Sequence, residues 1–152
     1  MKLRTKELIL CALFCALTAV GAQLTIPVPY GAITLQLLFM LLAGLMLPPL
    51  MSFLSMAVYV LLGMVGAPVF AGFSGGFSSI TSPTFGFVIG LALSAPLISA
   101  LFRALKKRWK LFPAALVAGL AGILVTYLCG AVYGYFVMTL VLNKEVRLWF
   151  IL

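Results

Sequence analysis

The sequence predicts an all-α membrane protein, a compact bundle with five membrane helices and the start of a sixth. The chain has 152 residues, which fits a single domain over residues 1–152, and 65% of them are hydrophobic. Its two acids and ten bases fall in three clusters, at residues 2–7, 103–110 and 144–147. The uncharged blocks between these clusters are too long and too apolar for the core of a soluble domain of this size.

The first helix is expected over residues 7–23. Lys2, Arg4 and Lys6 precede it, as they would in a cleaved signal peptide. Four further apolar segments follow, however, so a first membrane helix is the better interpretation.

A break over residues 24–31 follows, because its prolines and its glycine rule out a regular helix. The second segment spans 32–47 and the third 50–65, with Pro48 and Pro49 between them. Both are shorter than the roughly 20 residues that a helix perpendicular to the bilayer needs. We expect them to be tilted, or extended by irregular chain that protein or a water-filled cavity covers.

A long stretch rich in Gly, Ser and Phe, residues 66–84, leads to a fourth segment at 85–102. The fifth segment, at 113–142, is long enough to tilt or to break near Gly130 and Gly134. We expect the irregular stretches at residues 24–31 and 66–84 to form the walls of a binding pocket, since irregular backbone at membrane depth has to be covered.

Charge counting predicts the topology. If the N-terminus is cytoplasmic, four crossings return the cluster at 103–110 to the cytoplasm, and that side carries eight Lys and Arg against Lys144 and Arg147 opposite. The positive-inside rule favours this orientation, in which both irregular stretches face outward. Residues 147–152 look like the start of a sixth segment, so we expect the chain to be truncated.

The absence of ionisable groups excludes several function classes. The chain has no histidine, and neither Glu7 nor Glu145 lies within an apolar segment, whereas an ion-coupled transporter usually keeps such a group at membrane depth. We therefore expect a partner to supply the energy, and no enzyme chemistry. The cysteines lack metal-ligand spacing, and the bases flank apolar segments rather than form a nucleic-acid-binding stripe. No metal or other cofactor is expected.

The loop at residues 68–84 is the most distinctive motif. It combines glycines that permit positive φ, aromatic rings and hydroxyls. These residues are Gly72, Gly75 and Gly76, Phe70, Phe73 and Phe77, and Ser74, Ser78 and Thr84. No Lys follows the glycines, so it is not a phosphate loop. We favour a ligand lid or wall over a flexible external loop, because its aromatic density is not that of a solvated linker.

Thr34 and Gln36 open the second segment, where a hydroxyl and an amide would suit a neutral polar ligand group. The alternatives are helix capping for Thr34 and an inter-helix hydrogen bond for Gln36. Tyr127, Tyr133 and Tyr135 lie toward the outer half of the fifth segment, where tyrosines usually form an interfacial belt; pocket lining is the alternative.

Ala12 and Ala16 lie four residues apart in the first helix, with Ala19 and Ala22 close to the same face. Small residues at this spacing allow another helix to approach closely. The approaching helix belongs either to a partner or to the same chain.

Together these residues resemble the BioY family of biotin transporters, the substrate-binding S components of energy-coupling factor (ECF) transporters. The matching stretches are 16–23 (ALTAVGAQ), 33–39 (ITLQLLF), 41–44 (LLAG), 61–72 (LLGMVGAPVFAG), 74–76 (SGG) and 82–84 (SPT). Residues 130–144 resemble members with a Tyr-rich segment there.

The resemblance implies about six membrane helices in a prokaryotic plasma membrane, both termini in the cytoplasm, and a biotin pocket closed by external loops. It implies energy from a transmembrane T component and two ATPases, with the T component docked on the small residues of the first helix. The expected biotin-binding residues are Thr34, Gln36, Phe70, Gly72, Ser74, Gly75, Gly76, Thr84 and Tyr133, and the expected partner contacts are Ala12, Ala16 and Ala19.

The chain departs from the family pattern twice. Residues 82–87 read SPTFGF where the family resembles GPTGGY, so Phe85 adds a ring and Phe87 lacks a hydroxyl. The family's last helix begins with Pro-Gly-Asp and a Lys, and this chain ends before that point; we expect weakened biotin binding from 152 residues.

Two alternatives to a biotin S component stay open. One is an S component for thiamin or riboflavin, and the other is a membrane scaffold subunit without a small-molecule ligand.

Overall fold

The computed structural model describes residues 5–28 and 31–141 and shows a bundle of α-helices, which confirms the predicted fold class. The helices are α1 (Thr5–Gln23), α2 (Gln36–Met46), α3 (Pro49–Val65), α4 (Phe85–Leu105) and α5 (Leu111–Phe136). The other elements are strands β1 (Thr25–Val28) and β2 (Gly31–Thr34), the 3₁₀ turns η1 (Ala71–Phe73) and η2 (Phe77–Thr81), and the π-helical turn η3 (Val137–Val141). The expected start of a sixth segment, at residues 147–152, lies outside the described residues.

The break after α1 is more regular than predicted. β1 and β2 pair as an antiparallel hairpin, with Thr25 opposite Thr34 and Val28 opposite Gly31. The second helix therefore begins at Gln36 and not at residue 32. A two-stranded hairpin tolerates proline because each strand has a free edge. It also pairs backbone groups that an irregular break would leave without partners.

The other helix boundaries follow the residues that punctuate the sequence. Pro48 and Pro49 separate α2 from α3, and Pro49 occupies the first turn of α3, where the missing N–H costs nothing. Gly66 ends α3 with φ 112°, a left-handed cap that glycine adopts without a Cβ clash. The predicted break near Gly130 and Gly134 is wrong, because α5 runs continuously through both glycines.

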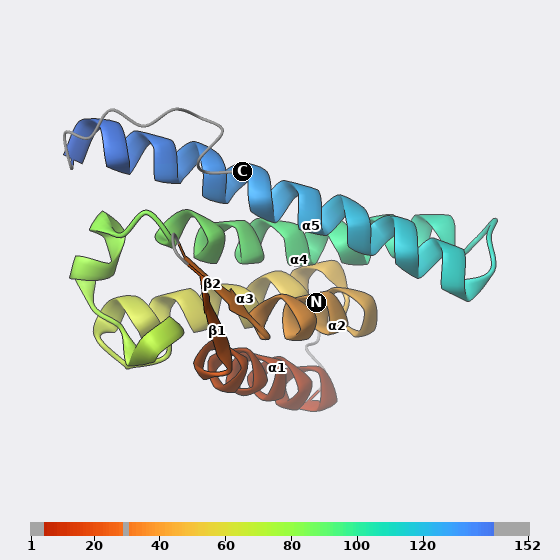
Figure 1. Cartoon of the computed structure of the whole chain (residues 1–152). Helices are drawn as coiled ribbons and strands as arrows, with labels where there is room; N and C mark the ends of the chain where they lie inside the picture. The colour runs from red at the N-terminus through yellow and green to blue at the C-terminus, as the bar shows by residue number, and fades with distance from the viewer. Residues whose placement is uncertain (1–4, 29–30, 142–152) are drawn as a thin grey trace.

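The most extensive contact between helices joins α4 to α5 (Figure 1). Gly86, Gly90 and Ser94 recur every four residues on α4 and are buried, as are Gly122 and Thr126 on α5. A Cβ at Gly90 would lie only 2.9 Å from the Cα of Thr126, and the hydroxyls of Ser94 and Thr126 are hydrogen-bonded at 2.7 Å. Small residues thus let the two backbones approach closely. The sequence analysis named such a pattern only on α1.

Three helical stretches are long and apolar enough to cross a membrane, namely Thr5–Gln23, Phe85–Leu105 and Leu111–Thr139. Leucines such as Leu120 and Leu124 lie on the outside of the bundle, as in a protein surrounded by lipid. This is a multi-pass membrane protein. α2 has 11 residues and is about 16 Å long at 1.5 Å per residue, so it is too short to cross a bilayer alone, as expected for this segment.

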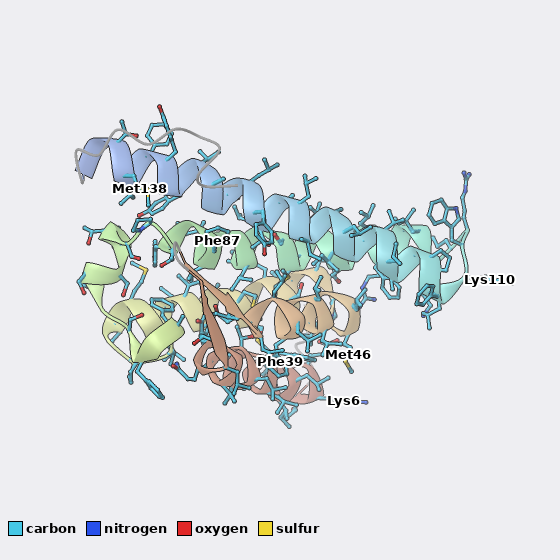
Figure 2. All side chains as sticks on the ribbon, viewed as in Figure 1. Lys6, Phe39, Met46, Phe87, Lys110 and Met138 are labelled. Carbon is cyan, nitrogen blue, oxygen red and sulfur yellow. The ribbon has the colours of Figure 1, made fainter. Side chains whose placement is uncertain are left out.

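The charged side chains that the structure describes gather at one end of the bundle. Figure 2 shows Lys6 and Lys110 toward the same end. The bases between Arg103 and Lys110 all lie in or next to the α4–α5 connection. The chain between α3 and α4, residues 66–84, lies at the opposite end (Figure 1). Among the described residues the two ends of the molecule therefore differ in character: one is basic, and the end at residues 66–84 has no charged side chain.

Candidate functional site

Residues 66–84, called here the α3–α4 segment, form a folded structure at the end of the bundle opposite the basic α4–α5 connection. Gly72 and Gly76 have φ of 69° and 88°, as predicted for a left-handed backbone. Gly75 is needed for a different reason, since a Cβ there would overlap the carbonyl oxygen of Ala67. Phe73 is the non-glycine residue with positive φ, 55°, in the described chain. Hydrogen bonds to three helices hold the segment, which argues against the flexible-loop alternative.

The first attachment comes from Gln23, the last residue of α1. Its Nε2 donates to the carbonyl oxygens of Phe70 (3.0 Å) and Pro68 (3.3 Å), and its Oε1 accepts from the N–H of Phe73 (3.0 Å). The sequence analysis included Gln23 in a matching stretch but assigned it no role. An amide at the end of an apolar helix, directly before a proline-containing break, is the signal that could have identified it.

The second attachment is a chain of polar side chains beneath the segment. Thr34 Oγ1 donates to Gln36 Oε1 (2.9 Å), Gln36 Nε2 donates to the Tyr59 hydroxyl, and that hydroxyl donates to the carbonyl oxygen of Val69 (3.1 Å). The inter-helix hydrogen bond considered for Gln36 is therefore present. Helix capping by Thr34 is wrong, because Thr34 ends β2 and Leu35 is the N-cap residue of α2. Tyr59 is fully buried, and the sequence analysis did not name it.

The third attachment joins α5 to the far part of the segment. The hydroxyl of Tyr133 donates to the carbonyl oxygen of Ile80 at 2.6 Å. The belt interpretation thus does not describe Tyr133, whereas Tyr127 is half exposed on the same helix. α5 reaches the site through this one tyrosine.

A row of aromatic rings packs between these attachments. Phe70 is buried and contacts Tyr59 and Phe85 edge to face, with ring centroids 5.6 and 6.0 Å away. Phe85 is buried as well and lies 5.9 Å from the ring of Tyr133. An added Cβ at Gly63 would overlap the Phe70 ring, so α3 leaves space for it. These rings give the site an apolar wall.

The remaining predicted site residues lie nearer the surface. Ser74 is exposed and its hydroxyl donates to the carbonyl oxygen of Ala71 at 2.8 Å, while Thr84 pairs with the hydroxyl of Ser82 at 2.8 Å. Phe73 and Phe77 are 71% and 72% exposed. The structure therefore links Gln36, Phe70 and Tyr133 through two other residues: Gln36 bonds to Tyr59, whose ring contacts Phe70, and Phe85 lies between Phe70 and Tyr133. The glycines and hydroxyls of the segment are exposed or partly buried.

The exposed alanines of α1 lie away from this site. Ala12 and Ala16 are exposed and Ala19 is partly buried, whereas Ala22 is completely buried. The core-facing side of α1 consists of Cys11, Phe14, Cys15, Thr18, Gly21 and Ala22, so the expectation that Ala22 lies close to the face of Ala12 and Ala16 is wrong. Packing among residues 5–28 and 31–141 therefore does not account for Ala12 and Ala16, whose side chains are exposed in this part of the chain.

The chemistry of the site is uncharged. No Asp, Glu, Lys, Arg or His occurs between Glu7 and Arg103. Within residues 5–28 and 31–141, no group of His, Cys, Asp and Glu could hold a metal ion. The groups available to a ligand are an amide, hydroxyls, backbone N–H groups and aromatic rings, and these suit a neutral polar ring with an apolar body.

Comparisons with known proteins agree with this geometry. The model of the BioY family matches residues 1–152. The "Probable biotin transporter BioY" of Pyrococcus horikoshii is 44% identical over 84% of this chain and 74% of its own length. The "Biotin transporter BioY" of Thermotoga maritima is 38% identical over 82% of this chain and 72% of its own length.

A solved structure has the same fold. The crystal structure of the S-component for biotin from an ECF-type ABC transporter superposes with a TM-score of 0.80, at 24% identity, over 89% of this chain and 76% of that one. The helical fold of this chain therefore belongs to a known architecture.

Proposed function

This chain belongs to the BioY family, and we propose that it binds biotin as the membrane-embedded S component of an ECF-type uptake transporter. Relatives that cover most of the chain carry the name biotin transporter, and a solved biotin S component shares its fold. The single observation that carries the proposal is the uncharged polar chain from Thr34 through Gln36 to Tyr59, covered by the glycine-rich α3–α4 segment.

The chemistry of this site suits the head of biotin. Biotin has a neutral ureido ring that both donates and accepts hydrogen bonds, fused to an apolar sulfur-containing ring. Gln36 presents the same two functions in one amide, and its burial strengthens each bond that it makes. Phe70 and Tyr133 supply ring faces for the apolar part. Gly72, Ser74, Gly75 and Thr84 supply backbone N–H groups and hydroxyls from the segment, and Gly76 provides a left-handed backbone position beside them.

The energy for uptake comes, in this proposal, from a transmembrane T component and two cytoplasmic ATPases. The described charges support a cytoplasmic N-terminus, because Lys6 and Lys110 lie toward the same end of the bundle (Figure 2). The site then opens away from the cytoplasm. Ala12, Ala16 and Ala19 offer the T component a helix face on which backbones can approach closely.

Substitution of Gln36 tests the ligand assignment. Gln36→Met keeps the length of the side chain and removes its hydrogen bonds, so we expect the Kd for biotin to rise about tenfold or more. The measurement is equilibrium binding of labelled biotin to purified protein in detergent, with thiamin and riboflavin as competitors. The assay is run on this chain and on a form extended to the length of its relatives.

Ser99→Ala is the matched control. Ser99 is buried and its hydroxyl donates to the carbonyl oxygen of Leu47, at the basic end of the bundle. Loss of this hydrogen bond should lower the thermal stability about as much as Gln36→Met does, and it should leave the Kd for biotin unchanged. Competition by thiamin or riboflavin but not by unlabelled biotin, or no biotin binding by either form of the protein, would contradict the proposal.

A further inference from the structure

Gln23 binds the α3–α4 segment with both ends of its amide. The three backbone groups that it contacts belong to Pro68, Phe70 and Phe73, between 45 and 50 residues away in the sequence. The planar amide of Gln carries a donor NH2 group and an acceptor oxygen side by side and has no charge, so it can bond an N–H and carbonyl oxygens at once. Asn is one methylene shorter, so a contact at this distance requires Gln.

The part of the segment that Gln23 holds is a closed turn. The N–H of Phe70 donates to the carbonyl oxygen of Ser74 at 3.0 Å, so residues 70–74 form a tight loop. Within that loop Gly72 and Phe73 are exposed, and both have positive φ. The amide of Gln23 lies across this turn and fixes the carbonyl of Phe70 and the N–H of Phe73 relative to α1.

The other attachments act on either side of this turn. The Tyr59 hydroxyl holds the carbonyl of Val69 before it, the N–H of Gly76 donates to the carbonyl of Gly63 after it (2.7 Å), and Tyr133 holds Ile80 further along. Phe70 is anchored by its buried ring. Among the side chains that the structure describes, Gln23 is therefore the one from outside the segment that bonds to residues 71–75.

We propose that Gln23 is a positioning residue for the ligand site. It latches the turn at residues 70–74 to the end of α1, and so sets how fast a bound ligand leaves beneath the segment. The inference rests on the proposed function in taking the α3–α4 segment as the cover of the ligand. The amide acts through the backbone of the turn and does not itself need to touch the ligand.

Gln23 can be changed without removing a core side chain. It follows Ala16 by seven residues and Ala12 by eleven, which places Gln23 within about 20° of each of them around the helix at 100° per residue. Ala12 and Ala16 are exposed, so this face points away from the core. A substitution there tests the latch rather than the packing of the bundle.

The experiment uses two variants and a neighbouring control. Gln23→Met keeps the side-chain length and removes all three hydrogen bonds. Gln23→Glu keeps an acceptor for the N–H of Phe73 but loses both donated bonds. Leu24→Met, at a residue 55% exposed, controls for a change at the end of α1. If Gln23→Met cannot be purified, Gln23→Asn takes its place.

Two measurements distinguish the effect of Gln23 on the turn from its effect on ligand release. Amide hydrogen exchange of the ligand-free protein should speed up across residues 70–74 in Gln23→Met and stay unchanged in α4 and α5. In Gln23→Glu the Phe73 amide should remain protected. Labelled biotin should dissociate about tenfold faster from Gln23→Met, a factor that corresponds to about 1.4 kcal/mol, with a smaller change in its association rate.

Each result decides a part of the inference. Unchanged hydrogen exchange at residues 70–74 in Gln23→Met would contradict the claim that Gln23 holds this turn. Faster exchange there with unchanged biotin dissociation would overturn its role in ligand release. An unsubstituted protein that binds no biotin would contradict the proposed function, and the exchange measurement would still decide whether Gln23 holds the turn.

Discussion

The α4–α5 interface and the α3–α4 segment are held together by different means. Between α4 and α5, Gly86 and Gly90 bring two backbones into direct contact. In the α3–α4 segment, the side chains of Gln23, Tyr59 and Tyr133 extend from three helices and form hydrogen bonds with separate backbone groups. Lipid is as apolar as leucine, so helices inside a bilayer associate through close packing, whereas irregular backbone needs hydrogen-bond partners.

This difference predicts which region moves. Contact between α4 and α5 continues along both helices, so no part of it can open without disturbing the rest. The α3–α4 segment is attached at separate points, and the loss of one attachment frees only the neighbouring residues. We therefore expect α4 and α5 to act as the scaffold and the segment to act as the part that opens for the ligand.

The largest effect is expected from Gly90→Leu, which would break the scaffold. Even a Cβ at Gly90 lies 2.9 Å from the Cα of Thr126, so a leucine forces the helices apart. We expect a loss of about 3 kcal/mol or more of stability, and much less folded protein. Thermal unfolding in detergent measures this loss. Leu93→Phe, an enlargement on the exposed side of α4, is the control and should have little effect; equal melting temperatures for the two variants would contradict the comparison.

A smaller and more local effect is expected from Tyr133→Phe. The change removes only the hydroxyl that donates to the carbonyl of Ile80, and one such hydrogen bond contributes about 1 kcal/mol. Hydrogen exchange should increase in η2 and remain unchanged where α4 packs against α5. The control is Tyr127→Phe, at a half-exposed tyrosine of the same helix, which should leave hydrogen exchange unchanged in both regions. Faster exchange throughout α5 would show that the segment and the scaffold are not separate.

The smallest effect on stability is expected from Phe73→Gly. Phe73 has φ 55°, which is unfavourable for a bulky residue, so glycine removes strain while it loosens the unfolded chain. The two effects should cancel to within about 0.5 kcal/mol. Phe77→Gly relieves no such strain at an equally exposed residue and should be about 1 kcal/mol less stable than Phe73→Gly. Thermal unfolding compares them, and the reverse order would contradict the role given to the left-handed backbone.

The positive φ at Phe73 is itself a reason to expect a role in binding. A strained, exposed aromatic residue is unusual, and such strain collects at functional sites. Binding of labelled biotin to Phe73→Gly and Phe77→Gly would separate the effect of this residue on stability from its effect on binding. We expect Phe73→Gly to weaken biotin binding although its stability is unchanged.

Most of the helical framework could be predicted from the sequence. Pro48 and Pro49 separate two helices, and Gly72 and Gly76 adopt positive φ, because these residues restrict or free the backbone whatever surrounds them. The hairpin at residues 25–34 could not be predicted. Its prolines argue against a helix, but whether two short stretches pair depends on where the rest of the fold holds them.

The candidate site was predicted in part, and the reason is also physical. Glycines, aromatics and hydroxyls within residues 68–84 identify an unusual loop by composition alone. The contacts that hold it come from Gln23, Tyr59 and Tyr133, which lie on three different helices. Spacing along one helix says nothing about which residue of another helix will lie opposite, so these attachments were found only in the structure.

Hydrophobicity and charge act residue by residue, so they suffice to predict that this protein lies in a membrane, that its bundle is helical and that its core is uncharged. The folded chain was needed to show that Gln36 bonds to Tyr59, that Phe70 is buried against Phe85, and that α4 and α5 touch through glycines. These are relations between distant parts of the chain. They depend on how close two backbones can come, and that distance is set by the packing of the whole bundle.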